Sequence, residues 1–200
     1  EDGRMVKGIL RGSLQLSYTL LKSLKWRENA ILLNGQSVHV NAIVHAGDVV
    51  SVALSERTPR EDLYCANAAK PDIVYEDDDL LVLNKPAGIA MHPKSGDASA
   101  SSLAAMLTSY LGEGSVPHFV SRLDKGTSGL LIAAKNGYVH DRLRRALHSS
   151  DLRREYRAVA VGRVEPPCGV IDAPIGRAEG SIIRRCVCAD GLPSLTEYET

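Results

Sequence analysis

The stretch from Arg122 to Lys135, RLDKGTSGLLIAAK, decides how the rest of the chain is arranged around it. An acidic residue, Asp124, stands between Arg122 and Lys125 in a short glycine-containing loop, and the apolar run GLLIAA follows. Positive charges beside a carboxylate favour its ionised form, which suits a nucleophile or a base. Aspartate in a turn more often only accepts backbone amide bonds, so these residues alone leave both roles open.

The segments around this loop have the patterns of strands and helices. HFVSR at 118–122 and GLLIAAK at 129–135 are predicted strands. Upstream, IVYE at 73–76 and LLVLN at 80–84 are predicted to be strands joined by the acidic turn between them. Apolar residues at three- and four-residue spacing predict a helix over 103–111.

The segments after the loop continue this mixed pattern. A helix is predicted from Tyr138 to His148, followed by a strand in REYRAVAVGRV at 154–164. The last residues, TEYET, also have the pattern of a strand, with no turn or polar tail after it, so we expect the chain to end inside a domain. Strands and helices alternate without a regular βαβ order, which favours an α+β fold with a mixed, largely antiparallel sheet.

The first fifty residues form a separate pattern. A helix is predicted from Ser13 to Leu24, with Ser13 as its N-cap. Asn34-Gly35 between two apolar runs predicts a hairpin with a type I′ turn, because both central residues of that turn need positive φ. A further turn and strand complete a compact unit. We therefore expect a small domain over 1–54, a linker over 55–70 and a second domain over 71–200.

Composition excludes several classes of protein. The 200 residues are 44% hydrophobic and 24% charged, as in globular domains, and the formal net charge is zero. Residues 101–160 nonetheless carry nine Lys and Arg against five Asp and Glu, so basic charge is concentrated in the middle of the chain. The four cysteines include no CxxC pair, no apolar run approaches the ~18 residues of a membrane span, and no phosphate-binding loop or zinc motif occurs. We expect a soluble cytoplasmic protein without a metal site.

Three blocks of sequence resemble a known enzyme family. The run from Arg122 to Lys135 resembles the signature HRLDxxTSGLLLxAK of the RluA-type RNA pseudouridine synthases, with Ser121 in place of the histidine. IVYEDDDLLVLNKPAGIAMHP at 73–93 resembles the family's first block, and REYRAVAVGRV with IDAPIGR resembles its second. The family's third block, which supplies a basic partner for the catalytic aspartate, has no counterpart before Thr200. The resemblance therefore implies a synthase domain that is incomplete at its C-terminal end.

The same resemblance implies roles for individual residues. Asp124 is implied to be catalytic, either as a nucleophile on the ribose or as a base, and the sequence leaves both routes open. Arg122 is implied to fill the space of a flipped-out base, and Tyr156 to pack on the uracil ring. Lys85 is expected either to contact RNA or to support the floor of the site. Weaker candidates for contacts to RNA phosphates, with a solvated helix face as the alternative for the arginines, are Lys125, Arg142, Arg144 and Arg145.

The first domain resembles the small RNA-binding domain first known from a ribosomal small-subunit protein, on the pattern LLNGQSVHVNAIVHAGDVVSV at 32–52. Together the resemblances imply a cytoplasmic, monomeric enzyme that isomerises uridine to pseudouridine in ribosomal or transfer RNA. The reaction needs no redox partner, so no cofactor and no membrane are implied. Two alternatives stay open: a catalytically inactive RNA-binding or ribosome-assembly protein that keeps the fold, and a glycosidase of free nucleosides that uses the same carboxylate.

Overall fold

The computed structural model divides the chain into two compact units, Glu1–Arg153 and Arg154–Thr200. Most of the predicted linker and Cys65 lie outside the residues that the structure describes. Within the described ranges, no helix combines the length and apolarity needed to cross a bilayer. The described residues are 2–54, 69–93, 102–112, 115–147, 149, 151–181 and 184–200.

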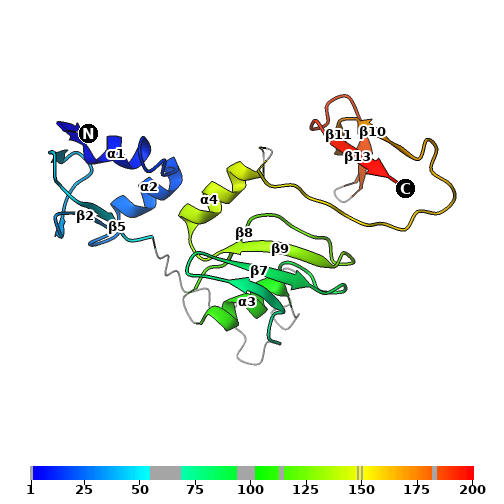
Figure 1. Ribbon diagram of the computed structural model, residues 1–200, viewed down its shortest axis with the longest axis horizontal. Helices are drawn as coiled ribbons and strands as arrows, with labels where there is room; N and C mark the ends of the chain where they lie inside the picture. The colour runs from blue at the N-terminus through cyan, green and yellow to red at the C-terminus, as the bar shows by residue number, and fades with distance from the viewer. Residues whose placement is uncertain are drawn as a thin grey trace. The chain divides into compact units, whose positions relative to one another are not determined.

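The first fifty residues form two short helices beside two small antiparallel sheets (Figure 1). The three-stranded sheet has the order β3-β2-β5, and β1 pairs with β4. Leucine, isoleucine and valine side chains from both helices and from the sheets make one hydrophobic core. The elements are β1 (Arg4–Met5), α1 (Val6–Arg11), α2 (Tyr18–Lys25), β2 (Ile31–Leu33), β3 (Gln36–Ser37), β4 (Ile43–Val44) and β5 (Val50–Val52).

The helix predicted from Ser13 to Leu24 begins later than expected. Ser17, not Ser13, is the N-cap of α2, because its side chain accepts a hydrogen bond from the backbone N–H of Leu20 at 3.2 Å. Before it, Gln15 takes a positive φ of 53°, and the chain turns between α1 and α2. Because a left-handed residue interrupts a helix, the prediction of one continuous helix was wrong in its first turn.

The predicted hairpin is confirmed. Asn34 and Gly35 have φ angles of 51° and 80°, and the flanking strands β2 and β3 pair antiparallel. Asn34 also donates to the carboxylate of Asp48 at 2.7 Å, and Asp48 accepts the backbone N–H of His45 at 2.7 Å. The bonds from His45 and Asn34 lower the pKa of Asp48. The turn residues of this small unit therefore stabilise each other.

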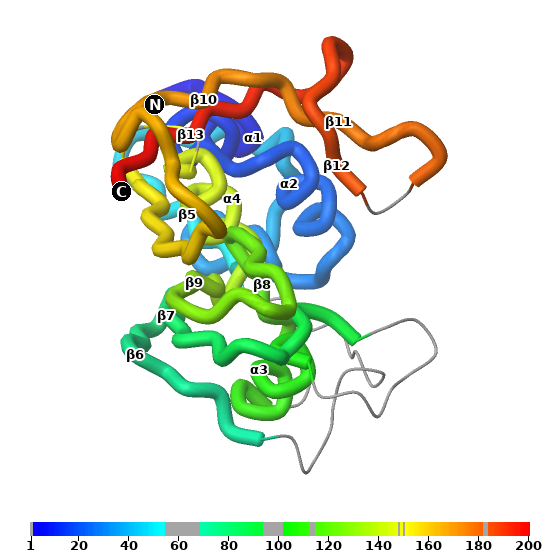
Figure 2. Tube along the Cα trace, turned by 90° about the vertical axis from the view of Figure 1, so that its right-hand side faces the viewer, coloured from blue at the N-terminus to red at the C-terminus, as the bar shows by residue number. Residues whose placement is uncertain are grey.

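A four-stranded antiparallel sheet of order β6-β7-β9-β8 is the centre of the rest of the first unit. The helices α3 and α4 lie on opposite sides of it (Figures 1 and 2), and apolar residues of α3 pack on β7 and β9. The strand and helix predictions for this region are confirmed to within about two residues at their ends, except that β8 is shorter. The elements are β6 (Ile73–Glu76), β7 (Leu80–Lys85), α3 (Leu103–Leu111), β8 (His118–Phe119), β9 (Gly129–Ala134) and α4 (Gly137–Ala146).

The second unit contains two antiparallel strand pairs, β10 with β13 and β11 with β12. The predicted terminal strand is confirmed as part of β13. The strand predicted over 154–164 is wrong for this structure, because no described strand pairs with that segment. Its residues Val159 and Val161 are fully exposed. The strands are β10 (Cys168–Asp172), β11 (Ile175–Arg177), β12 (Arg185–Val187) and β13 (Leu195–Glu199).

The α+β class with largely antiparallel sheets is confirmed. Apolar residues of α3 pack on the four-stranded sheet, while the strands of the second unit form separate pairs. The loop with Asp124 leaves the four-stranded sheet between β8 and β9, beside the hydrophobic core formed by β7, β9 and α3.

Candidate active site

Asp124 lies on the loop that connects β8 to β9, and its side chain is exposed. The residue before it, Leu123, is only 8% exposed and belongs to the core formed by α3, β7 and β9. The backbone N–H of Thr127 donates to the carbonyl of Asp124 at 3.0 Å and closes the turn. One apolar side chain therefore anchors the loop in the core, while the neighbouring carboxylate faces solvent.

Lys85 supports this loop from within the protein. It ends β7 opposite Gly129, and its side chain is 0% exposed. Its ammonium Nζ donates to the carbonyl oxygens of Pro86 at 2.9 Å, Ile89 at 2.9 Å and Lys125 at 3.4 Å. A charged group without solvent needs such acceptors. The cation therefore ties the 86–89 loop to the Asp124 loop.

The electrostatics of Lys85 follow from its position. Burial lowers the pKa of its ammonium group, and the negative charge of Asp124 opposes that shift. The backbone N–H of Gly88 also donates to the carbonyl of Lys125 at 2.7 Å, so two donors hold the same loop oxygen. Of the two roles that the sequence left open for Lys85, burial favours support of the loop over direct contact with RNA.

The two basic neighbours of Asp124 are both exposed. Neither Arg122 nor Lys125, within the described part of the chain, has an N atom within 4.0 Å of the Asp124 carboxylate. An ion pair with Asp124 therefore does not fix the orientation of Arg122. Its expected role beside a flipped base, and the expected phosphate contact of Lys125, stay predictions.

Tyr156 lies in the second unit, in the segment without regular secondary structure, and its side chain is 63% exposed. The structure brings Asp124, Lys125 and Lys85 together within the first unit. The predicted packing of Tyr156 on a uracil ring stays a prediction.

Two of the three arginines predicted on α4 are engaged with the turn before α2. Arg142 donates to the side-chain oxygen of Gln15 at 2.8 Å, and Arg145 donates to the backbone carbonyl of Gln15 at 3.3 Å. Arg145 also pairs with Asp141 at 2.6 Å. The side chains of all three arginines, including Arg144, are exposed.

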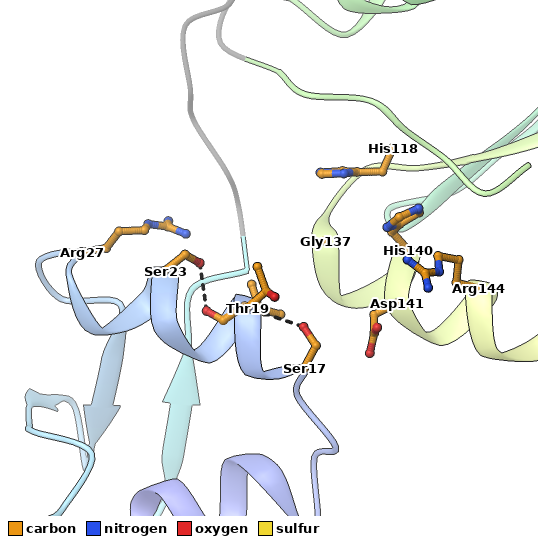
Figure 3. A pocket seen from close by; sticks show the side chains of 10 residues that line it. Ser17, Thr19, Ser23, Arg27, His118, Gly137, His140, Asp141 and Arg144 are labelled. Atoms are coloured by element: carbon orange, nitrogen blue, oxygen red, sulfur yellow. Dashed lines mark hydrogen bonds between the residues drawn. The ribbon is translucent and has the colours of Figure 1, made fainter. Parts of the chain in front are cut away.

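A cleft of about 670 Å³, which the sequence did not predict, is lined by residues of α2, β8 and α4 (Figure 3). On its β8 and α4 wall, the rings of His118 and His140 stack on each other with centroids 5.4 Å apart. Burial lowers the pKa of the His140 imidazole, the neighbouring His118 and Arg144 side chains act in the same direction, and a hydrogen bond with the backbone of Phe119 opposes the shift. The four-residue spacings Thr19–Ser23 and His140–Arg144 could have indicated that these side chains share helix faces.

No group of three or more histidine, cysteine, aspartate or glutamate side chains in the described ranges suits a metal ion. Cys168, Cys186 and Cys188 are free thiols. The described site offers the chemistry of an exposed carboxylate on a fixed loop with basic side chains beside it.

Comparison with known proteins identifies the family. The family model for RNA pseudouridylate synthase matches residues 79–198. An uncharacterised RNA pseudouridine synthase of Bacillus subtilis, YjbO, is 34% identical over 94% of this chain and 66% of its own length. A second one from the same organism, YlyB, is 36% identical over 86% of this chain and 58% of its own.

Ribosomal large subunit pseudouridine synthase D of Vibrio parahaemolyticus is 38% identical over 74% of this chain and 46% of its own length. A solved human structure, RNA pseudouridylate synthase domain containing 4, aligns with a TM-score of 0.46 and 25% identity over 64% of this chain and 52% of its own. The chain thus spans between about half and two thirds of the curated relatives that it matches. Since the family model covers well over half of the 200 residues and includes the Asp124 loop, this chain belongs to the RNA pseudouridylate synthase family.

Proposed function

We propose that this chain forms the part of an RNA pseudouridine synthase that presents the reactive carboxylate, and that Asp124 is the catalytic residue. The observation that carries the proposal is the placement of Asp124: its carboxylate is exposed on a loop that Leu123 and Lys85 hold from the protein interior. A reacting group must be accessible to substrate and fixed in position at the same time. The Asp124 loop meets both requirements.

The chemistry requires a carboxylate close to a ribose. Conversion of uridine to pseudouridine breaks the C–N glycosidic bond, turns the uracil and forms a C–C bond to the same ribose carbon. Asp124 would attack that carbon or remove the neighbouring 2′ proton. The uridine must first leave its stack, at a cost of a few kcal/mol. We assign Arg122 to the space that the base leaves and Tyr156 to the face of the uracil ring.

The RNA substrate is proposed to be ribosomal or transfer RNA in the cytoplasm, bound by a monomer. The Vibrio relative's name assigns that protein to the large ribosomal subunit, which supports ribosomal RNA for this chain. We assign residues 1–54 to RNA binding and residues 71–200 to the synthase domain. Exposed Lys125 and Arg144 supply positive charge for phosphates.

Release of tritium from RNA that contains 5-tritiated uridine tests the proposal, because forming the C–C bond expels that hydrogen. We expect the unmodified chain to release tritium and Asp124→Asn to reduce release to background. Asp78→Asn is the matched control, because Asp78 is an exposed aspartate of the β6–β7 turn. It should leave release unchanged.

The same assay separates the other functions. RNA binding without tritium release by the unmodified chain would support an inactive RNA-binding protein of this family. Release of free uracil from nucleosides would support a glycosidase. Equal tritium release by Asp124→Asn and the unmodified chain would overturn the assignment of Asp124.

A further inference from the structure

The solvent face of α2 carries two large aromatic side chains that are mostly exposed. Trp26, directly after the helix, is 86% exposed, and Tyr18, its first residue, is 71% exposed. Lys22 lies between them at four-residue spacing, and Lys25 is beside them. At 100° per residue, this face is opposite the buried Leu20, Leu21 and Leu24, so the core fixes its orientation.

Basic residues predominate in the sequence that leads up to and includes α2, and the first acidic residue after it is Glu28. From Arg4 to Arg27 the chain contains six basic residues, Arg4, Lys7, Arg11, Lys22, Lys25 and Arg27, and no aspartate or glutamate. Lysine is depleted in the cores of protein–protein interfaces, whereas clustered lysine and arginine with exposed aromatic rings are typical of surfaces for single-stranded nucleic acid. The composition of this face therefore fits RNA and does not fit an apolar protein partner.

We propose that this face of α2 binds unpaired RNA bases, which stack on Trp26 and Tyr18, while Lys22 and Lys25 contact the phosphates between them. The inference rests on the proposed action on RNA. It specifies which kind of RNA structure the first fifty residues would bind. A paired base hides its faces inside a duplex, whereas a loop base exposes a face that an aromatic ring can cover. The ligand is therefore a single-stranded loop.

The dimensions agree with a short segment of RNA. Eight residues separate Tyr18 from Trp26, which corresponds to about 12 Å along a helix axis. A stacked strand advances about 3.4 Å per nucleotide. The two rings therefore accommodate bases three to four nucleotides apart, and Lys22 lies level with the phosphates between those bases.

Trp26 is the only tryptophan of the chain, so its fluorescence reports directly on this face. We expect a short oligouridine to quench this fluorescence, and a blunt RNA duplex of equal charge to leave it unchanged. Trp26→Ala should weaken oligouridine binding, measured by anisotropy of a labelled oligonucleotide, about tenfold or more. Trp26→Tyr keeps an aromatic face and should retain most of the affinity.

Lys22→Gln tests the phosphate contact separately. It should reduce the slope of log affinity against log salt concentration by about 0.7. Val49→Ala is the matched control, because Val49 is an exposed side chain elsewhere in the first fifty residues. It should change neither affinity nor salt dependence.

Equal quenching by the duplex, or unchanged oligouridine affinity in Trp26→Ala, would overturn the inference. A fluorescence change that depends on protein concentration and not on RNA would also overturn it, since it would show self-association through this face. Tritium release distinguishes the two proposals. Release that persists without Trp26 quenching contradicts only the α2 surface, whereas quenching without release supports the surface and contradicts the enzyme.

Discussion

β9 and the segment 154–164 are both predicted from sequence to be strands, and their environments in the structure are opposite. GLLIAA in β9 lies between β7 and β8, and its residues Leu131 and Ala133 are buried. REYRAVAVGRV is rich in β-branched and apolar residues, as strands often are, yet it has no strand partner among the described residues, and Val159 and Val161 are fully exposed. An apolar pattern therefore predicts a strand only where a neighbour can accept it.

The physical reason lies in the backbone. A strand leaves its N–H and C=O groups unpaired unless a neighbouring strand binds them, and an isolated two-stranded hairpin is only marginally stable in water. β9 pairs with β7 over six residues, from Leu80 opposite Ala134 to Lys85 opposite Gly129. The segment 154–164 gains no such bonds in this structure, so β-propensity alone does not fold it.

Of the variants considered, truncation of one side chain in β9 and of one in the segment 154–164 should give the largest difference in the free energy of unfolding. Leu131→Ala removes a core side chain and should lower the free energy of unfolding by about 2–5 kcal/mol. Val161→Ala removes a solvated side chain and should change it by less than about 0.5 kcal/mol. Amide hydrogen exchange of β9 measures the first effect, and urea unfolding compares both.

Hydrogen exchange can also contradict the contrast between paired β9 and the unpaired segment 154–164. In the unmodified protein, the amides of 154–164 should exchange far faster than those of β9. Slow exchange of these amides would show that the segment is paired in solution. A decrease of more than about 1 kcal/mol in the free energy of unfolding of Val161→Ala would show the same.

Substitution of the buried Lys85 and of Arg157 in the solvated segment should give a second, smaller difference in the free energy of unfolding. Lys85→Met keeps much of the side-chain volume but leaves the carbonyls of Pro86, Ile89 and Lys125 without this donor. Removing the partner of buried polar groups costs about 1–3 kcal/mol. Arg157→Met, in the solvated segment, should cost less than about 0.5 kcal/mol.

Where in the structure Lys85→Met lowers stability is as informative as how far the free energy of unfolding falls. Lys85→Met should increase hydrogen exchange at Gly88, whose N–H donates to the same Lys125 carbonyl. If Gly88 keeps its protection and stability does not fall, Lys85 does not hold the two loops together.

The parts of the fold that the sequence predicted are those fixed by local chemistry. Asn34-Gly35 needs positive φ and takes it, and the apolar spacing of 103–111 becomes α3. The start of α2 was missed because Ser13 and Ser17 are equally good caps, and only the turn at Gln15 selects Ser17. The prediction of a strand over 154–164 was wrong because strand pairing depends on residues distant in sequence.

The site shows the same division. The motif indicated Asp124 as a candidate, and the structure exposes its side chain on the predicted loop. Burial of Lys85 could not be predicted, since lysine is almost never fully buried without partners, and its partners are carbonyls that carry no sequence signal. Engagement of Arg142 with Gln15 joins residues 127 positions apart, which a single sequence does not reveal.

The smallest predicted effect concerns an ion pair at the far end of β9. Lys135, directly after that strand, pairs with Glu76 of β6 at 2.8 Å, and Tyr110 of α3 donates to the same carboxylate at 2.7 Å. Lys135 and then Tyr110 lower the pKa of Glu76 below its ordinary value of 4.5. A carboxyl group with a lowered pKa in the folded state stabilises the protein above its unfolded pKa, and this contribution is lost as the pH falls through the folded value.

Glu76→Gln should therefore reduce stability at pH 7 by less than about 1 kcal/mol, as for other partly exposed pairs. The difference from the unmodified protein should disappear once the pH is well below 4.5. Urea unfolding at a series of pH values measures it, with Glu155→Gln in the solvated segment as the control that shows no such difference. A deficit in Glu76→Gln that persists undiminished in acid would mean that packing, and not the charge pair with Lys135, joins β6 to the end of β9.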